Sequence, residues 1–163
     1  MILVTTGTTQ FPFIRMGDFV SRVIAARQAH EKIIFQCGPL SFTSPAPNIS
    51  VYSEISFPKF LHLMHSARII ITHGGPATIY LAISCGKKPL VIPRQQQYKE
   101  HVNNHQIYFC TYLSEHNKIT LIDPQSTTND ALKAILNKNH DICPRSKSKK
   151  TGSSLRAYLF KWT

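Results

Sequence analysis

The chain has 163 residues, 42% of them hydrophobic, and a formal net charge of +11 at pH 7. This length is typical of a single domain that can bury its own core. No apolar run approaches the roughly 18 residues of a membrane-spanning helix, and the first residues lack the basic leader of a signal peptide, so we expect a cytoplasmic protein. The cysteines are scattered without a CxxC pair, which disfavours disulfides and a zinc site.

Short apolar runs that favour strands alternate with segments of helical periodicity. In chain order we predict a strand at Met1–Thr6, a helix with an apolar stripe from Phe19 to Ala26, a strand at Lys32–Gly38, a loop at Leu40–Asn48 and a strand at Ile49–Ile55. Strands separated by helices form parallel sheets with right-handed crossovers. The fold class is therefore α/β, with a Rossmann-like parallel sheet and helices on both faces.

The same alternation continues in the second half of the chain. The predicted elements are a helix capped by Ser56 with Pro58 in its first turn, a strand at Arg68–Thr72, a helix at Pro76–Cys85, a strand at Pro89–Ile92, a helix from about Glu100 to Leu113, a strand at Ile119–Ile122 and a helix from about Thr128 to Leu136. We expect residues 1–140 to form this domain and residues 141–163 to form a basic tail with a short amphipathic segment.

The tail carries much of the positive charge. Six of the nineteen basic side chains follow Asp141, and no acidic residue does. The side chains expected to contact an anionic membrane surface or a partner are Lys147, Lys149, Lys150, Arg156 and Trp162. A solvated, disordered end is an equally plain interpretation, and nucleic-acid binding is disfavoured because no recognisable reading motif is present.

The strongest candidate site follows the strand that ends near Thr72. His73-Gly74-Gly75 breaks the apolar pattern, and Pro76 opens a helix whose first residues, Ala77 and Thr78, are small or hydroxylated. A helix N-terminus that begins with free backbone N–H groups can hold a phosphate. From this turn alone, a phosphate site and a simple packing turn are equally good interpretations.

Loops after neighbouring strands should meet the turn at one edge of the sheet. Gly7-Thr8-Thr9, Phe57 and Arg94 lie in such loops and, with His73, offer amides, hydroxyls, an imidazole and a guanidinium that suit a diphosphate. P-loop, GxGxxG and DxD patterns are absent, and so is any cluster of metal ligands, so we expect no cofactor and no metal. Glu100 is almost the only acid in the candidate site, which leaves the general base uncertain.

Two motifs carry a resemblance to a known family. ITHGGPATIYLAISCGKKPLVIP followed by EHVNNHQ resembles the C-terminal, donor-binding half of a GT-B glycosyltransferase of the family 28 type, and VTTGTTQFPF resembles the start of that half. The resemblance is nearest to the donor-binding subunits of two-component bacterial capsule and exopolysaccharide glycosyltransferases. It extends to the eukaryotic two-part UDP-GlcNAc transferase and, more distantly, to the GlcNAc transferase of peptidoglycan synthesis, and it covers Met1 to about Leu136.

The resemblance implies roles for individual residues. The implied donor- and nucleotide-binding residues are Gly7, Thr8, Thr9, Phe57, His73, Gly74, Gly75, Ala77, Thr78, Arg94, Glu100, Asn104, His105 and Gln106. Relatives carry a ribose-binding carboxylate where this chain has Leu81, so Glu100 is the candidate substitute. His73 is the one candidate catalytic residue, since the base would come from the partner.

The function implied is that of a UDP-sugar-binding subunit of an inverting hexosyltransferase. It would elongate a lipid-linked oligosaccharide with a membrane-anchored acceptor-binding partner, peripherally at the inner face of the plasma membrane. The helix N-terminus, His73 and Arg94 would stabilise the departing UDP. The donor would be UDP-galactose in a beta-1,4 transfer, with UDP-GlcNAc as the alternative, and a non-catalytic accessory subunit is the second interpretation.

Overall fold

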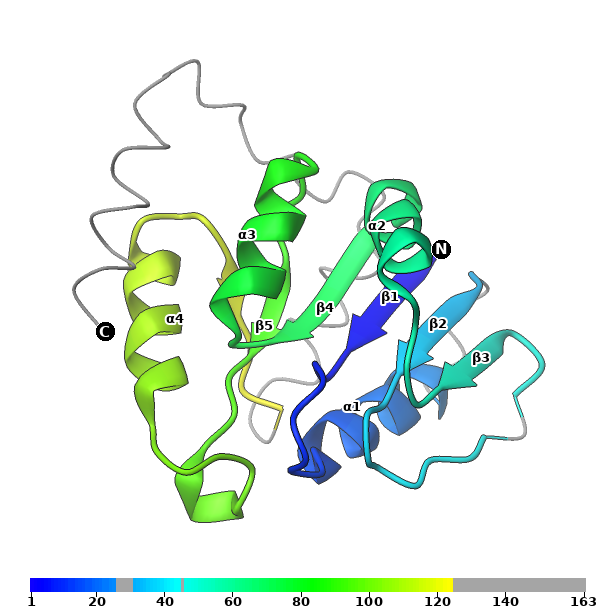
Figure 1. The fold of residues 1–163 in the computed structure, drawn as a ribbon, viewed down its shortest axis with the longest axis horizontal. Helices are drawn as coiled ribbons and strands as arrows, with labels where there is room; N and C mark the ends of the chain where they lie inside the picture. The colour runs from blue at the N-terminus through cyan, green and yellow to red at the C-terminus, as the bar shows by residue number, and fades with distance from the viewer. Residues whose placement is uncertain (26–30, 45, 125–163) are drawn as a thin grey trace.

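Six parallel strands form one sheet with the order β3-β2-β1-β4-β5-β6 in a computed structural model that describes residues 1–25, 31–44 and 46–124 (Figure 1). The strands are β1 Ile2–Thr5, β2 Ile33–Gln36, β3 Ile49–Tyr52, β4 Ile69–His73, β5 Leu90–Ile92 and β6 Thr120–Leu121. The helices are α1 Ile14–Ala25, α2 Phe57–Ser66, α3 Pro76–Ser84 and α4 His105–Glu115, with a 3-10 turn, η1, at Gln96–Tyr98.

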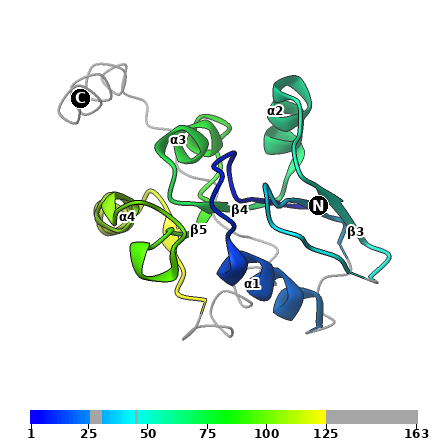
Figure 2. The same ribbon diagram turned by 60° about the horizontal axis from the view of Figure 1, so that its bottom comes forward.

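Helices cover both faces of the sheet (Figure 2). α1 packs on the face that carries Ile2, Val4 and Ile71, while α2 and α3 pack on the face of Leu3 and Ile70. The central strands are buried along their whole length, which is typical of parallel strands covered on both sides. The predicted α/β class with a Rossmann-like parallel sheet is confirmed.

The helix predicted from Glu100 begins later, so that boundary is wrong. α4 starts at His105, and residues 100–104 belong to the loop after β5. The Asn104 side chain holds this loop, since its Oδ1 accepts the Gln96 N–H at 2.9 Å. Lys99, directly before the predicted start, adopts a left-handed conformation with φ of 55°.

The start of α2 agrees with the prediction in position, but the predicted cap is not formed. Ser56 precedes α2 as predicted and Pro58 lies in the first turn, but the Ser56 side chain makes no capping hydrogen bond. The predicted helix at 128–136, the predicted basic tail at 141–163 and Ala26 lie outside the described residues. In the part of the chain that is described, no helix is long and apolar enough to cross a membrane.

Candidate functional site

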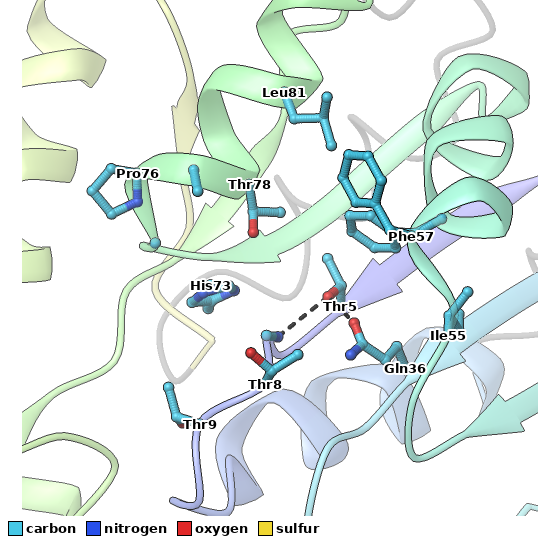
Figure 3. A pocket seen from close by; sticks show the side chains of 14 residues that line it. Thr5, Thr8, Thr9, Gln36, Ile55, Phe57, His73, Pro76, Thr78 and Leu81 are labelled. Carbon is cyan, nitrogen blue, oxygen red and sulfur yellow. Dashed lines mark hydrogen bonds between the residues drawn. The ribbon is translucent and has the colours of Figure 1, made fainter. Parts of the chain in front are cut away.

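A pocket of about 570 Å³ opens at the carboxyl edge of the sheet, where the loops after β1 and β4 meet the start of α2 and α3 (Figure 3). All strands are parallel, so these loops necessarily leave the sheet on the same side. The pocket is lined by Thr5, Gly7, Thr8, Thr9, Gln36, Ile55, Phe57, Phe60, His73, Gly75, Pro76, Ala77, Thr78 and Leu81.

The floor of the pocket is polar and held by side chains at strand ends. Thr5 Oγ1 donates to Gln36 Oε1 at 2.5 Å and accepts the Gly7 N–H at 3.2 Å (Figure 3). Gly7 has a φ of +77°, and a Cβ there would lie 2.6 Å from His73 Cε1. Glycine is therefore required at this turn for both its backbone conformation and its close approach to the imidazole.

His73 ends β4 and is enclosed between two glycines. A Cβ at Gly75 would overlap His73 Nε2, so both glycines pack against the imidazole. Burial lowers the pKa of His73 to about 3, and the nearby charge of Arg94 acts in the same direction. His73 is thus neutral at pH 7, with Nδ1 3.3 Å from Thr72 Oγ1, and it can offer a hydrogen bond but no positive charge.

The N-terminus of α3 forms another wall. Gly75 is the N-cap without a side-chain capping bond, and Pro76 follows in the first turn. The first intrahelical donor is the Ile79 N–H, which bonds the Gly75 carbonyl at 3.1 Å. The N–H groups of Ala77 and Thr78 precede it at the positive end of the helix dipole, in the arrangement that binds phosphate.

The opposite wall of the pocket is apolar. It consists of Ile55, Phe57, Phe60 and Leu81, and Phe57 is 67% exposed (Figure 3). No carboxylate lines the pocket, and the described residues contain no group of three or more His, Cys, Asp or Glu side chains arranged for a metal ion. The pocket therefore pairs a polar, amide-rich end with a surface suited to a flat ring.

Arg94, predicted among the donor-binding residues, does not line the pocket. Its side chain is fully buried, and its guanidinium donates to the carbonyls of Thr6 at 2.6 Å, Phe11 at 2.8 Å and Glu100 at 3.2 Å. Burial lowers the pKa of Arg94 to about 10, which leaves it charged at pH 7. Arg94 ties both ends of the loop after β1 to the loop after β5.

Glu100, the predicted substitute for the ribose-binding carboxylate, is also buried and lies outside the pocket lining. It is 2% exposed, binds Arg15 through Nε at 2.9 Å and Nη2 at 2.6 Å, and accepts the Gln95 N–H at 3.1 Å. Gln106 is buried as well, and its Oε1 accepts the backbone N–H of Arg94 at 3.0 Å. Arg94, Glu100 and Gln106 therefore bind other parts of the protein and do not line the pocket.

The remaining predicted residues of this region lie outside the pocket lining. Asn104 binds the Gln96 backbone, and the exposed His105 ring lies 4.6 Å from that of His101. Gly74 is buried, and a Cβ there would lie 2.9 Å from Cys110 Sγ, so this glycine lets α4 pack against the turn. By contrast, the predicted Gly7, Thr8, Thr9, Phe57, His73, Gly75, Ala77 and Thr78 all line the pocket.

Sequence reasoning missed the polar residues at the ends of two strands. Thr5 and Gln36 are register partners in β1 and β2, and both line the pocket. A signal was present, since each is the polar last residue of an otherwise apolar strand. Ile55 and Phe60 were also missed, and nothing in the local pattern separates them from core residues.

Comparison with protein families identifies the chain. Residues 1–157 match the glycosyltransferase family 28 C-terminal domain. The chain belongs to this family. The match runs beyond Leu136, where we expected the resemblance to end, and includes most of the predicted tail. Comparison with curated protein sequences gives no significant match.

Solved structures show the same fold. MurG of Acinetobacter baumannii superposes with a TM-score of 0.63 and 13% identity, over 98% of this chain and 49% of that protein. The glycotransferase of kitacinnamycin gives 0.62 and 19%, over 98% and 39%, and the spinosyn forosaminyltransferase SpnP gives 0.60 and 14%, over 98% and 39%. The chain thus has the fold of the C-terminal, donor-binding half of GT-B glycosyltransferases and spans less than half the length of these proteins.

Proposed function

We propose that the chain is the UDP-sugar-binding part of an inverting glycosyltransferase and that the pocket at the carboxyl edge holds the nucleoside diphosphate. The observation that carries this proposal is the pairing, within one pocket, of the α3 N-terminus with an apolar wall, in a member of this family. A nucleoside diphosphate has the matching two ends, one anionic and one flat and largely apolar.

The diphosphate is assigned to the polar end. The N–H groups of Ala77 and Thr78 and the loop Gly7-Thr8-Thr9 surround this end, with neutral His73 between them. The base and ribose are assigned to the wall of Phe57 and Leu81. Donors already in place where negative charge accumulates on the departing UDP lower the barrier to transfer without reorganisation.

The pocket lacks a general base, and we assign that group to an acceptor-binding partner. No carboxylate lines the pocket, and the only imidazole there is neutral and enclosed. Exposed apolar side chains lie on the loops and first helical turns that follow the carboxyl ends of the strands: Ile14, Phe57, Tyr98, Val102 and Tyr108. Such side chains are typical of a surface that another domain or subunit covers.

We assign the partner to a membrane-anchored subunit and the acceptor to a lipid-linked oligosaccharide at the cytoplasmic face. UDP-galactose in a beta-1,4 transfer, in capsule or exopolysaccharide synthesis, is the first choice of reaction, and UDP-GlcNAc is the second choice of donor. The first choice rests purely on the resemblance to capsule-type donor-binding subunits that HGGPAT and EHVNNHQ carry. Turnover of each donor by the reconstituted pair separates the two.

Calorimetric titration of the chain with UDP tests the site. Wild type should bind UDP, and Gly75→Asp should abolish binding because it places a carboxylate beside His73 at the diphosphate end. Asn103→Asp is the matched control, since it adds the same charge at an exposed position outside the pocket. Absence of UDP binding by wild type, or equal binding by Gly75→Asp, contradicts the assignment.

Activity should require both proteins. The chain alone should transfer no sugar to a lipid-linked acceptor, and the chain with its membrane partner should. Thr78→Pro, which removes one of the helix N–H donors at the third helical position, should then abolish transfer by the pair. If the pair tolerated this change, the chain would be an accessory subunit and not the donor-binding half.

A further inference from the structure

Three ionisable side chains are buried together behind the pocket floor: Arg15 of α1, and Arg94 and Glu100 of the loop after β5. Their residues are 8%, 0% and 2% exposed. Arg15 and Glu100 form a two-bond ion pair, at 2.9 and 2.6 Å. The hydrogen bonds of Arg94 go to neutral backbone carbonyls instead.

The cluster therefore holds one more positive charge than negative charge. A structural clamp could be built from hydrogen bonds without this excess, and a buried unneutralised charge is costly. Arg94 Nε is buried without a hydrogen-bond partner among the described residues, and the guanidinium lies 4.6 Å from the centroid of the Phe13 ring, in a cation–π contact that stabilises its charge without neutralising it. The excess charge calls for a role outside the cluster.

The charge lies directly behind the loop that forms the pocket floor. Arg94 binds the carbonyls of Thr6 and Phe11, which bracket the segment Gly7–Gln10. Its field reaches the pocket, because it contributes to the lowered pKa of His73 in the pocket wall. No lining side chain offers a compensating negative charge. In a water-poor interior such a field is weakly screened and favours an anion in the pocket.

We propose that the Arg15–Glu100–Arg94 cluster is a positioning element whose net charge sets the affinity of the pocket for the diphosphate of the donor. Arg94 acts through the loop that it fixes and through its electric field, without touching the ligand. Arg15 and Glu100 neutralise each other, so the net charge of the cluster is a single positive unit. This inference rests on the proposed function, since it assigns the diphosphate to the same pocket.

A charge series tests the proposal. Arg15→Gln brings the net charge of the cluster to zero, Glu100→Gln raises it to two, and the double variant restores it to one, while Arg94 keeps its own hydrogen bonds. Affinity for UDP is measured by calorimetry and affinity for uridine by NMR titration. Uridine lacks the diphosphate and so reports the shape of the pocket without its charge.

A unit charge acting over roughly 10 Å at an effective dielectric constant near 20 changes the affinity by about tenfold or more for each negative charge of the ligand. Arg15→Gln should therefore weaken UDP binding by at least about tenfold, Glu100→Gln should strengthen it by at least about tenfold, and the double variant should lie within about threefold of wild type. Uridine binding should change less than about twofold throughout, because the neutral ligand does not sense the charge.

Lys99→Asn is the matched control. Lys99 is exposed and precedes Glu100 in the sequence. The substitution removes the same charge as Arg15→Gln, and asparagine tolerates the left-handed backbone at this position. Water screens an exposed charge, so UDP affinity should stay within about twofold of wild type. A loss as large as that of Arg15→Gln would contradict a specific role for the buried cluster.

Two outcomes overturn the proposal. One is UDP affinities independent of the charge series, and the other is parallel losses of UDP and uridine in both single variants, which would make the cluster a structural clamp only. Thermal melts show which variants fold. Each folded variant then tests the proposal by itself, because the direction of its change in UDP affinity is predicted. UDP binding by wild type that is insensitive to charge leaves the proposed function intact, whereas no UDP binding by wild type contradicts the proposed function itself.

Discussion

Two loops leave the same edge of the sheet, and only one of them opens onto the pocket. The turn after β4, His73-Gly74-Gly75, leads into the bare N-terminus of α3. The loop after β5, from Arg94 to Asn104, is far more polar but folds onto itself. Glu100 binds Arg15 and the Gln95 N–H, and Arg94 binds backbone carbonyls.

The difference lies in whether local polar groups satisfy one another. In the glycine turn, no side chain caps the helix, and small residues let a ligand reach the backbone N–H groups. In the polar loop, the Arg94 guanidinium and the Glu100 carboxylate find internal partners and are withdrawn from solvent. Polar residues in a loop therefore indicate a ligand site only when their partners are missing.

Removing the internal support should have the largest effect. Arg94→Met leaves the carbonyls of Thr6, Phe11 and Glu100 without their donor, and should lower the free energy of unfolding by about 3–5 kcal/mol. Urea denaturation measures this loss. Arg22→Met, which removes a single bond from an exposed side chain to the Pro124 carbonyl, should cost less than about 1 kcal/mol. Unchanged stability of Arg94→Met with loss of UDP binding would mean that Arg94 faces the ligand.

The glycine of the pocket floor should come next. Gly7→Ala strains a left-handed backbone and pushes a methyl group against His73, so we expect a loss of about 1 kcal/mol in stability and at least about tenfold in UDP affinity. Gly86→Ala is the matched control, since Gly86 has a φ of +74° and open space around its Cβ position. It should lose similar stability and keep UDP affinity. Equal UDP affinities for both variants would remove the Gly7 turn from the site.

The buried imidazole gives a pH dependence of known sign. The folded-state pKa of His73 is about 3, below its ordinary value of 6.5, so the unfolded chain binds the proton more readily between these values. The stability contributed by neutral His73 is present above pH 6.5 and is lost as the pH falls toward 3, by up to about 1.4 kcal/mol per pH unit. The free energies of unfolding of wild type and His73→Gln, measured by denaturation at several pH values from 7 to 4.5, should therefore converge as the pH falls. A constant difference between the two proteins over this range would contradict an enclosed, neutral His73.

The apolar wall should produce the smallest effect. No carboxylate lines the pocket to bind the ribose hydroxyls, so wild type should bind UDP and 2′-deoxy-UDP within about threefold of each other. Leu81→Glu supplies an acceptor on that wall and should shift the ratio toward UDP by about fivefold. Ser84→Glu, exposed on the same helix outside the lining, should leave the ratio unchanged. A strong preference of wild type for UDP would reveal a ribose-binding group outside the apolar wall.

The parts of the fold with local causes were predictable. Ile69–Ile71 can only be a buried strand, and Gly75-Pro76 marks a helix start in the sequence itself. The failures have long-range causes. The ion pair of Glu100 joins it to Arg15, 85 positions away, and the Thr5–Gln36 bond joins residues 31 positions apart. Periodicity cannot reveal either contact, because both depend on the strand order of the sheet.

We expect the glycine turn, and not the polar loop, to bind the donor. Titration of the labelled chain with UDP, followed by the chemical shifts of backbone amides, distinguishes the two segments. We predict saturable shifts at Gly7–Thr9 and Gly75–Thr78, the two segments that line the pocket, and little change at Asn103–His105. Shifts centred on Asn103–His105, or no shifts at all, would contradict the account.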